Sequence, residues 1–272
     1  MSCNHNCGSC SSDCGKNKTI LFQNNENNNI KKIIGIVSGK GGVGKSMVTS
    51  MIAIALAKMG KKVGILDSDI TGPSIPKALG IKPGIDGTDT MLFPNESKLG
   101  IKVMSINLLM DDPEAPVLWR GPMISSALKQ FYSDTLWGEL DYLLIDMPPG
   151  TGDVALTIFQ SIPVDGVVIV STPQDLVKMI VGKAVSMCKQ MNINILGLVE
   201  NMSYIICPCC GNPIYPFGTS KLIEVSNHFE IKPLISLPLM PSVATLADCG
   251  RLEDNDSEEF ANLATKIDEL EI

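Results

Sequence analysis

The sequence of 272 residues has no apolar run long enough to cross a membrane, since a spanning helix needs about 18 or more such residues. Its first fifteen residues are polar and cysteine-bearing, unlike the apolar core of a secretory signal. We therefore expect a cytoplasmic protein. The 24 glycines and 17 prolines are too few for a low-complexity chain, and 44% hydrophobic residues suffice for a sizeable core.

An excess of basic residues is also lacking, because the formal net charge is −7. This charge disfavours a nucleic-acid backbone or an anionic membrane surface as the main partner, so we expect neither. Nine cysteines are too sparse for a disulfide scaffold, and their odd number in a reducing compartment indicates metal, redox or core use.

The chain divides by composition into a cysteine-rich segment (1–14), a polar tether (15–29) that we expect to be flexible, and one domain (30–272). Within the domain, short apolar runs alternate with helical patterns, which predicts a doubly wound α/β fold with a mostly parallel sheet between helices. The predicted strands are 33–38, 63–66, 101–106, 142–146, 166–170, 195–200 and 234–237. The predicted helices are 46–59, 122–136, 154–161, 176–191, 221–229 and 258–270.

A phosphate-binding loop follows the first predicted strand. The residues are Gly39, Lys40, Gly41, Gly42, Val43, Gly44, Lys45 and Ser46, and they fit G-x-x-x-x-G-K-[ST] between a strand and a helix. Glycines let backbone N–H groups face phosphate oxygens, and Lys45 neutralises charge on the β- and γ-phosphates. Ser46 would place its hydroxyl on Mg²⁺. A merely flexible turn is the weaker interpretation, because spacing and flanking elements agree.

The run from Lys40 to Ser46 (KGGVGKS) resembles the deviant Walker A motif of the class that contains the nitrogenase iron protein and the Min and Par ATPases. In that class the early lysine reaches the partner's nucleotide, so the resemblance implies that Lys40 acts in a homodimer that closes on ATP. Met47 stands where the class usually has threonine, which removes one side-chain contact to phosphate.

Acidic residues end two of the predicted strands. Asp67 and Asp69 follow strand 63–66, and Asp146 ends strand 142–146, so both groups would lie beside the phosphate loop. Asp146 suits Mg²⁺ held through water, and Asp69 suits orientation of the water that attacks the γ-phosphate. A single acid at a strand end could equally cap a helix, but the neighbouring phosphate loop favours the catalytic interpretation.

Further segments narrow the resemblance. DSDITGPSIP, VLWRGPM, DMPPGTGD and ENMSYIICPCCG are similar to segments of the Mrp/NBP35 (ApbC-like) family of P-loop ATPases that carry iron–sulfur clusters. The resemblance implies Mg²⁺-dependent, slow ATP hydrolysis and delivery of a [4Fe–4S] cluster to apo-proteins. It also implies that Asn201 recognises adenine, although from the residues alone Asn201 is a turn residue after a strand. Arg120 also matches the family pattern, but the residues assign it no chemical role. The sequence does not identify the proteins that receive the cluster.

Cys207 and Cys210 form a C-x-x-C pair in a loop between a strand and a helix. Two thiolates cannot complete a tetrahedral site, but two chains of a dimer supply four, as a bridging [4Fe–4S] cluster requires. The resemblance implies the same arrangement. A redox pair, or a zinc site completed by His228 or Cys249, remains an alternative. Cys209, between the two, could compete as a ligand.

Four more cysteines lie at the front of the chain. Cys3, Cys7, Cys10 and Cys14 suffice for a second cluster or a zinc site, and they resemble the amino-terminal cluster segment of NBP35-type proteins, although their spacing is tighter. Cys188 and Cys249 we expect to be inert buried thiols.

Two other functions share these features. A Min- or Par-like positioning switch would use the same ATP-dependent dimer on a membrane or DNA, but the last twenty residues are acidic rather than a basic amphipathic helix. A zinc-stapled nucleotide switch would use the cysteines structurally. An electron-donating reductase similar to the nitrogenase iron protein ranks third, after the cluster carrier and the positioning switch, because the cluster cysteines of that protein lie far apart in sequence.

Overall fold

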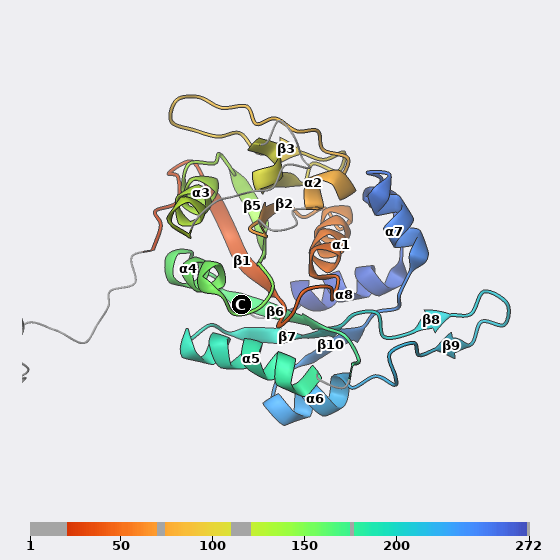
Figure 1. The fold of residues 1–272 in the computed structure, drawn as a ribbon. Coiled ribbons are helices and arrows are strands. Elements are labelled where there is room, and N and C mark those ends of the chain that lie inside the picture. Colours follow the sequence, from red (N-terminus) through yellow and green to blue (C-terminus); the bar gives the residue numbers. More distant parts are fainter. Residues whose placement is uncertain (1–20, 70–73, 110–120, 175–176, 271–272) are drawn as a thin grey trace, which may run out of the picture.

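The computed structural model describes residues 21–69, 74–109, 121–174 and 177–270, which form a central sheet covered by helices on both faces (Figure 1). The sheet has eight strands in the order β10-β7-β6-β1-β5-β2-β4-β3. All neighbouring pairs are parallel except the edge pair β3 and β4. The expected doubly wound, mostly parallel α/β fold is confirmed.

The strands are β1 (Asn29–Val37), β2 (Val63–Asp67), β3 (Asn95–Glu96), β4 (Lys102–Ser105), β5 (Glu139–Asp146), β6 (Gly166–Ser171), β7 (Ile195–Glu200) and β10 (Pro233–Ser236). The central strands are apolar on both faces because helices cover both, so β2 and β6 are buried at every position. Strand β1 lies in the middle, between β5 and β6, and delivers the phosphate loop to the centre of the sheet.

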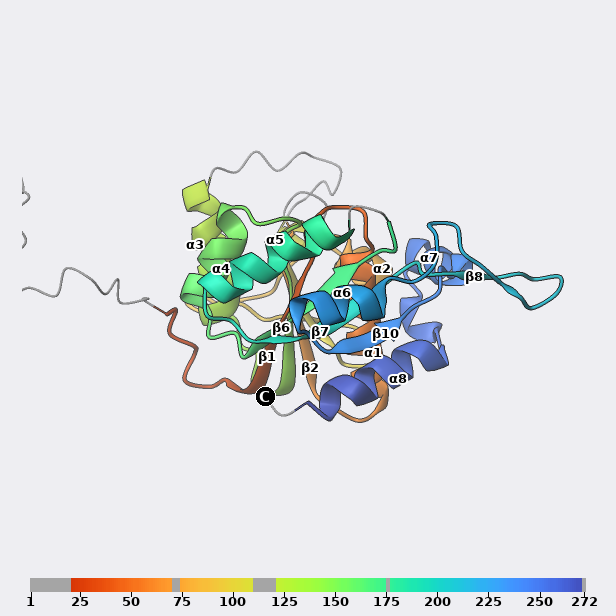
Figure 2. The same cartoon turned by 90° about the horizontal axis from the view of Figure 1, so that it is seen from below.

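Two apolar cores lie on the two faces of the sheet (Figures 1 and 2). One is formed by α1 (Lys45–Lys58), α2 (Ile75–Ala78), α7 (Pro241–Asp248) and α8 (Glu258–Asp268). The other is formed by α3 (Gly121–Ser133), α4 (Asp153–Ser161), α5 (Val177–Gln190) and α6 (Leu222–Phe229). Each predicted strand and helix occurs within a few residues of its expected bounds.

Several short elements were not expected from the sequence. Helices α2 and α7 begin with a proline in their first turn, and each is eight residues or shorter, so neither shows a clear helical period. A small hairpin, β8 (Ile205–Ile206) and β9 (Pro213–Ile214), interrupts the path from β7 to α6. Figure 1 shows this hairpin projecting from the body of the domain; we call residues 204–220 the cysteine arm.

The segment 21–28, part of the predicted tether, contacts the domain. The Phe22 amide donates to the Ser161 carbonyl over 2.6 Å, and the Phe22 ring packs on the core beneath α3 and α4. The Asn28 side chain pairs with the backbone of Thr135 and Gly138 at 2.9 and 2.8 Å.

None of the helices in the part that the structure describes is both long and apolar enough to span a bilayer.

Candidate functional site

The carboxyl ends of the strands bring the polar residues together. The register pairs Asp67 with Asp146 and Asp67 with Ser105, so three polar side chains lie side by side on β5, β2 and β4. All three are buried. The phosphate loop follows β1 at the same edge, as expected for ligand sites in open parallel sheets.

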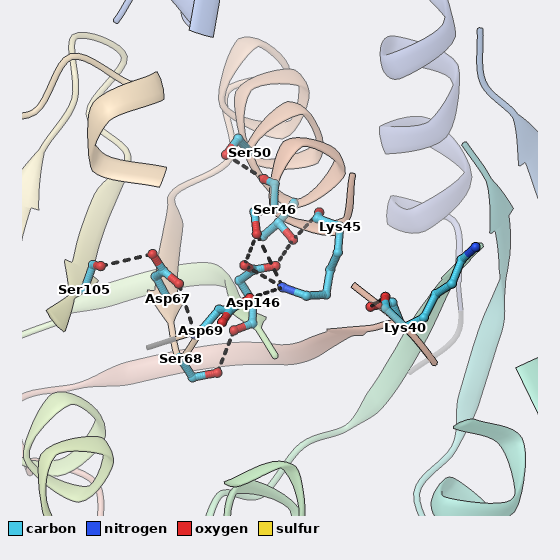
Figure 3. A network of polar contacts seen from close by, with 11 residues as sticks. Lys40, Lys45, Ser46, Ser50, Asp67, Ser68, Asp69, Ser105 and Asp146 are labelled. Carbon is cyan, nitrogen blue, oxygen red and sulfur yellow. Dashed lines mark hydrogen bonds and ion pairs between the residues drawn. The ribbon is translucent and has the colours of Figure 1, made fainter. Parts of the chain in front are cut away.

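The phosphate loop ends in a left-handed turn that starts α1. Gly44 caps α1 with φ of 78°, and a Cβ at this position would come within 2.4 Å of the Asn201 side-chain nitrogen. Lys45, the first residue of α1, is only 5% exposed and is aimed at two carboxylates (Figure 3). Its Nζ lies 2.8 Å from Asp146 and 3.8 Å from Asp69. This geometry brings three of the predicted nucleotide residues to one point.

Asp146 is the centre of the polar network and is fully buried. It accepts hydrogen bonds from the Ser46 hydroxyl at 2.6 Å and the Thr49 hydroxyl at 2.7 Å, besides its ion pair with Lys45. Paired hydroxyl and carboxylate oxygens at a phosphate loop are the hard ligands that Mg²⁺ prefers, so the side chains present fit this ion.

Asp67 and Asp69 differ in their surroundings. Asp67 accepts a hydrogen bond from Ser105 at 3.0 Å, and burial together with the nearby Asp146 charge raises the pKa of Asp67 to about 8. Asp69 follows the strand, is slightly exposed, and its amide donates to the Asp67 carboxylate over 3.2 Å. Asp69 is therefore the partly exposed carboxylate of the two and lies near Lys45 of the phosphate loop, whereas the buried Asp67 accepts the hydrogen bond from the Asp69 amide.

Lys40 occupies a different position from Lys45. Its Nζ donates to the side-chain oxygen of Gln174, which follows β6, and Figure 3 shows the Lys40 side chain pointing away from the Lys45 and Asp146 cluster. The side chain of Met47 packs on the core that α1 covers. Asn201 is buried after β7 and donates through its side-chain amide to the Val43 carbonyl of the phosphate loop at 2.9 Å.

Cys207 and Cys210 lie at the turn of the cysteine arm. The Cys207 amide donates to Asn212 and the Gly211 amide donates back to the Cys207 carbonyl, both over 2.9 Å, so the backbone folds tightly around the pair. Cys210 is exposed and Cys207 is partly exposed. The backbone N–H groups of Cys209 and Cys210 lower the pKa of the Cys207 thiol, which favours the thiolate that binds metal.

The arrangement argues against a zinc site that His228 or Cys249 completes beside Cys207 and Cys210. Among the described residues, no group of three histidine, cysteine or acidic side chains lies close enough to hold a metal, so neither His228 nor Cys249 joins the pair. Cys188 is fully buried, and burial raises the pKa of its thiol to about 11, as expected for an inert core cysteine. Cys249 is exposed, contrary to expectation, because it follows the end of the short helix α7.

Some predicted residues lie outside the described ranges: Cys3, Cys7, Cys10 and Cys14, and also Arg120. Four polar residues at this edge of the sheet were not predicted from the sequence: Thr49, Ser105, Gln174 and Glu200. Thr49 could have been found, because it is four residues after Lys45 and therefore on the same helix face. Ser105, Gln174 and Glu200 lie at or just after the ends of predicted strands, where a search of every carboxyl end would have included them.

The chain matches a known protein family over most of its length. The model of the NUBPL iron-transfer P-loop NTPases, a ParA group, matches residues 29–270. An iron–sulfur cluster carrier protein of Clostridium perfringens is 45% identical over 91% of this chain and 90% of its own length. A carrier protein of the same name from Methanocaldococcus jannaschii is 45% identical over 97% of this chain and 96% of its own length.

Solved structures give the same grouping. A nucleotide-binding protein of Archaeoglobus fulgidus in complex with ADP superposes with a TM-score of 0.76 at 44% identity, over 85% of this chain and 90% of its own. The MinD cell division protein of Aquifex aeolicus gives a TM-score of 0.60 at 18% identity, over 89% and 98%, which shows a shared fold alone. The phosphate loop, the paired acids and these matches together show that the chain belongs to the NUBPL family of iron-transfer P-loop NTPases.

Proposed function

We propose that this protein is an ATP-hydrolysing carrier that binds a [4Fe–4S] cluster and delivers it to apo iron–sulfur proteins in the cytoplasm. One observation carries the proposal: the cysteine arm starts at the same sheet edge as the phosphate loop, and Asn201 at its root contacts Val43 in that loop. The names of the relatives from C. perfringens and M. jannaschii support it.

The nucleotide residues then have separate roles. Lys45 binds the β- and γ-phosphates, and Ser46 with Asp146 holds Mg²⁺, which supplies charge neutralisation on the phosphate oxygens. Asp69 orients the attacking water, and Asn201 contacts the adenine. Lys40 leaves Gln174 to reach the nucleotide of a second chain. The backbone of the loop residues Gly39, Gly41, Gly42, Val43, Gly44 and Met47 surrounds the phosphates.

The cluster is cargo shared by two chains. Cys207 and Cys210 of each chain supply two thiolates, so a homodimer completes the four ligands of a [4Fe–4S] cluster. Cys3, Cys7, Cys10 and Cys14 form a second, separate cluster site. This division predicts two kinds of iron in the dimer that respond to different substitutions.

Anaerobic reconstitution with iron and sulfide tests the proposal in the full-length protein. A Cys207→Ser/Cys210→Ser variant should lose the [4Fe–4S] Mössbauer signal of the bridging site and should no longer activate an apo iron–sulfur protein. Cys249→Ser is the matched control, because it removes an exposed thiol outside the arm. A variant with serine at all four front cysteines should retain the bridging cluster and lose only the second signal.

Two results would reject this function. One is wild-type protein that holds zinc and no iron after reconstitution, which would favour the zinc-stapled switch. The other is equal iron content and equal cluster transfer in the Cys207→Ser/Cys210→Ser and Cys249→Ser variants, which would show that the cysteine arm does not bind the cluster.

A further inference from the structure

Glu200 is a buried carboxylate that the nucleotide site does not use. It ends β7, is 2% exposed, and lies between Ser171 of β6 and Ser236 of β10 in the sheet register. A carboxylate removed from water is unfavourable unless it accepts hydrogen bonds. Its partners therefore show what holds it in place.

The partners come from the two ends of the cysteine arm. One carboxylate oxygen, Oε2, accepts from the Ser203 hydroxyl at 2.5 Å, directly before the arm. The other, Oε1, accepts from the Lys221 amide at 2.8 Å, directly after it. The Ser236 hydroxyl adds a longer contact of 3.4 Å to Oε2. A single side chain thus joins the points where the chain leaves the domain and returns to it.

Backbone hydrogen bonds reinforce the outgoing end of the arm. The Ser203 amide donates to Leu237 at 2.8 Å, and the Leu239 amide donates to Tyr204 at 2.7 Å. Between Glu200 and Ser203, Met202 has a left-handed backbone with φ of 56°, which is uncommon outside glycine and turns the chain sharply. The start of the arm is therefore held in a fixed direction.

The same root touches the phosphate loop. Asn201, the residue after Glu200, donates to the Val43 carbonyl, and its side chain lies so close to Gly44 that a Cβ there would clash. A shift of the phosphate loop therefore moves Asn201. Asn201 directly follows Glu200 in the chain, and the Glu200 carboxylate holds both ends of the arm.

We propose that Glu200 is a positioning residue that couples the nucleotide at the phosphate loop to the orientation of the cysteine arm. It touches neither nucleotide nor cargo. By holding Ser203 and Lys221 against the end of β7, it makes the arm follow Asn201 instead of moving independently. The role of this coupling in cluster release rests on the proposed function. The coupling between the phosphate loop and the arm rests on the contacts of Asn201 and Glu200 alone.

The test is Glu200→Gln, which keeps the shape but leaves an amide –NH₂ group facing one of the donors. Glu253→Gln is the matched control: Glu253 is also buried and accepts from the Ser97 hydroxyl and the amides of Lys98 and Leu99, away from the arm. Amide hydrogen exchange of the full chain is measured with and without ADP and Mg²⁺.

In wild type and in Glu253→Gln, we expect ADP to slow exchange in residues 204–220. In Glu200→Gln, the arm should exchange roughly tenfold faster without nucleotide, and ADP should no longer change it. ADP affinity should stay close to wild type, because the phosphate loop is intact. A merely structural role would change the baseline exchange and leave the ADP response in place.

The proposal is overturned if the arm of Glu200→Gln keeps a wild-type response to ADP, or if the wild-type arm does not respond at all. The exchange readout requires no cluster, so it is independent of the iron measurements. Wild-type protein without iron would reject the proposed function, whereas an unresponsive arm in iron-loaded protein would reject only this coupling. In loaded protein, Glu200→Gln should also bring the ratio of transfer rates with and without ATP close to one.

Discussion

Replacing Thr49 by valine tests whether Asp146 depends on α1 for its position. Thr49 is fully buried, and its hydroxyl donates to Asp146 at 2.7 Å. Valine has nearly the same shape, so the substitution removes the hydrogen bond without opening a cavity. A hydrogen bond to a charged group contributes about 1.5–3 kcal/mol. The Asp146 oxygen that loses this donor is buried, so water does not replace the lost hydrogen bond.

We therefore expect Thr49→Val to lower the free energy of unfolding by about 1.5–3 kcal/mol, with a fall in Tm of roughly 3–12 °C. Urea unfolding followed by circular dichroism measures the first quantity and calorimetry the second. Binding of ADP with Mg²⁺ should weaken as well, because Asp146, the carboxylate proposed to hold Mg²⁺, is then held by fewer donors.

Thr265→Val is the control for this prediction. Thr265 lies on α8, is exposed, and its hydroxyl donates to the Ala261 carbonyl of its own helix at 3.0 Å. The control should change stability by no more than about 0.5 kcal/mol, as is usual for surface positions. If Thr49→Val and Thr265→Val differ by less than this amount, the argument that Thr49 anchors Asp146 is wrong.

Three further predictions use other features of the site. Gly44→Ala should cost more stability than Gly60→Ala and weaken nucleotide binding, because both positions have positive φ but only at Gly44 would the Cβ meet the Asn201 side chain; equal unfolding midpoints would contradict this. The folded state binds the Asp67 proton more tightly than the unfolded state does. The protonated Asp67 side chain therefore contributes fully to stability below the unfolded pKa of 3.8, and this contribution is lost as pH rises to about 8. Asp67→Asn should flatten the decline in urea-measured stability between about pH 4 and about pH 8, and an unchanged slope would count against it. Iodoacetamide at about pH 8 should leave Cys188, with its pKa of about 11, unmodified in folded protein, and mass spectrometry that finds it labelled without unfolding would refute its burial.

Most of the fold followed from local patterns. Continuous apolar runs such as residues 166–170 predicted strands buried on both faces, and the structure confirms this one as β6 (Gly166–Ser171). The short helix α7 and the hairpin of the cysteine arm were not predicted, because elements of two to eight residues do not repeat a period often enough to be recognised. Cys249 was expected to be buried for the same reason, because the end of α7 directly before it was not recognised.

The sequence by itself determined the chemistry whose residues are neighbours along the chain. The phosphate loop from Gly39 to Ser46, the acids that end two strands and the pair Cys207 and Cys210 were all identified by spacing. Each of these depends on one turn or one strand end, and local backbone geometry fixes it.

Only the tertiary structure decided how these parts contact one another. The pairing of Lys40 with Gln174, of Asn201 with Val43, and of Glu200 with the two ends of the cysteine arm joins residues that no shared period or motif relates. These contacts depend on strand order and register, which place β1, β6 and β7 side by side. Strand order results from the burial of both faces of the whole sheet, so no single segment of sequence encodes it.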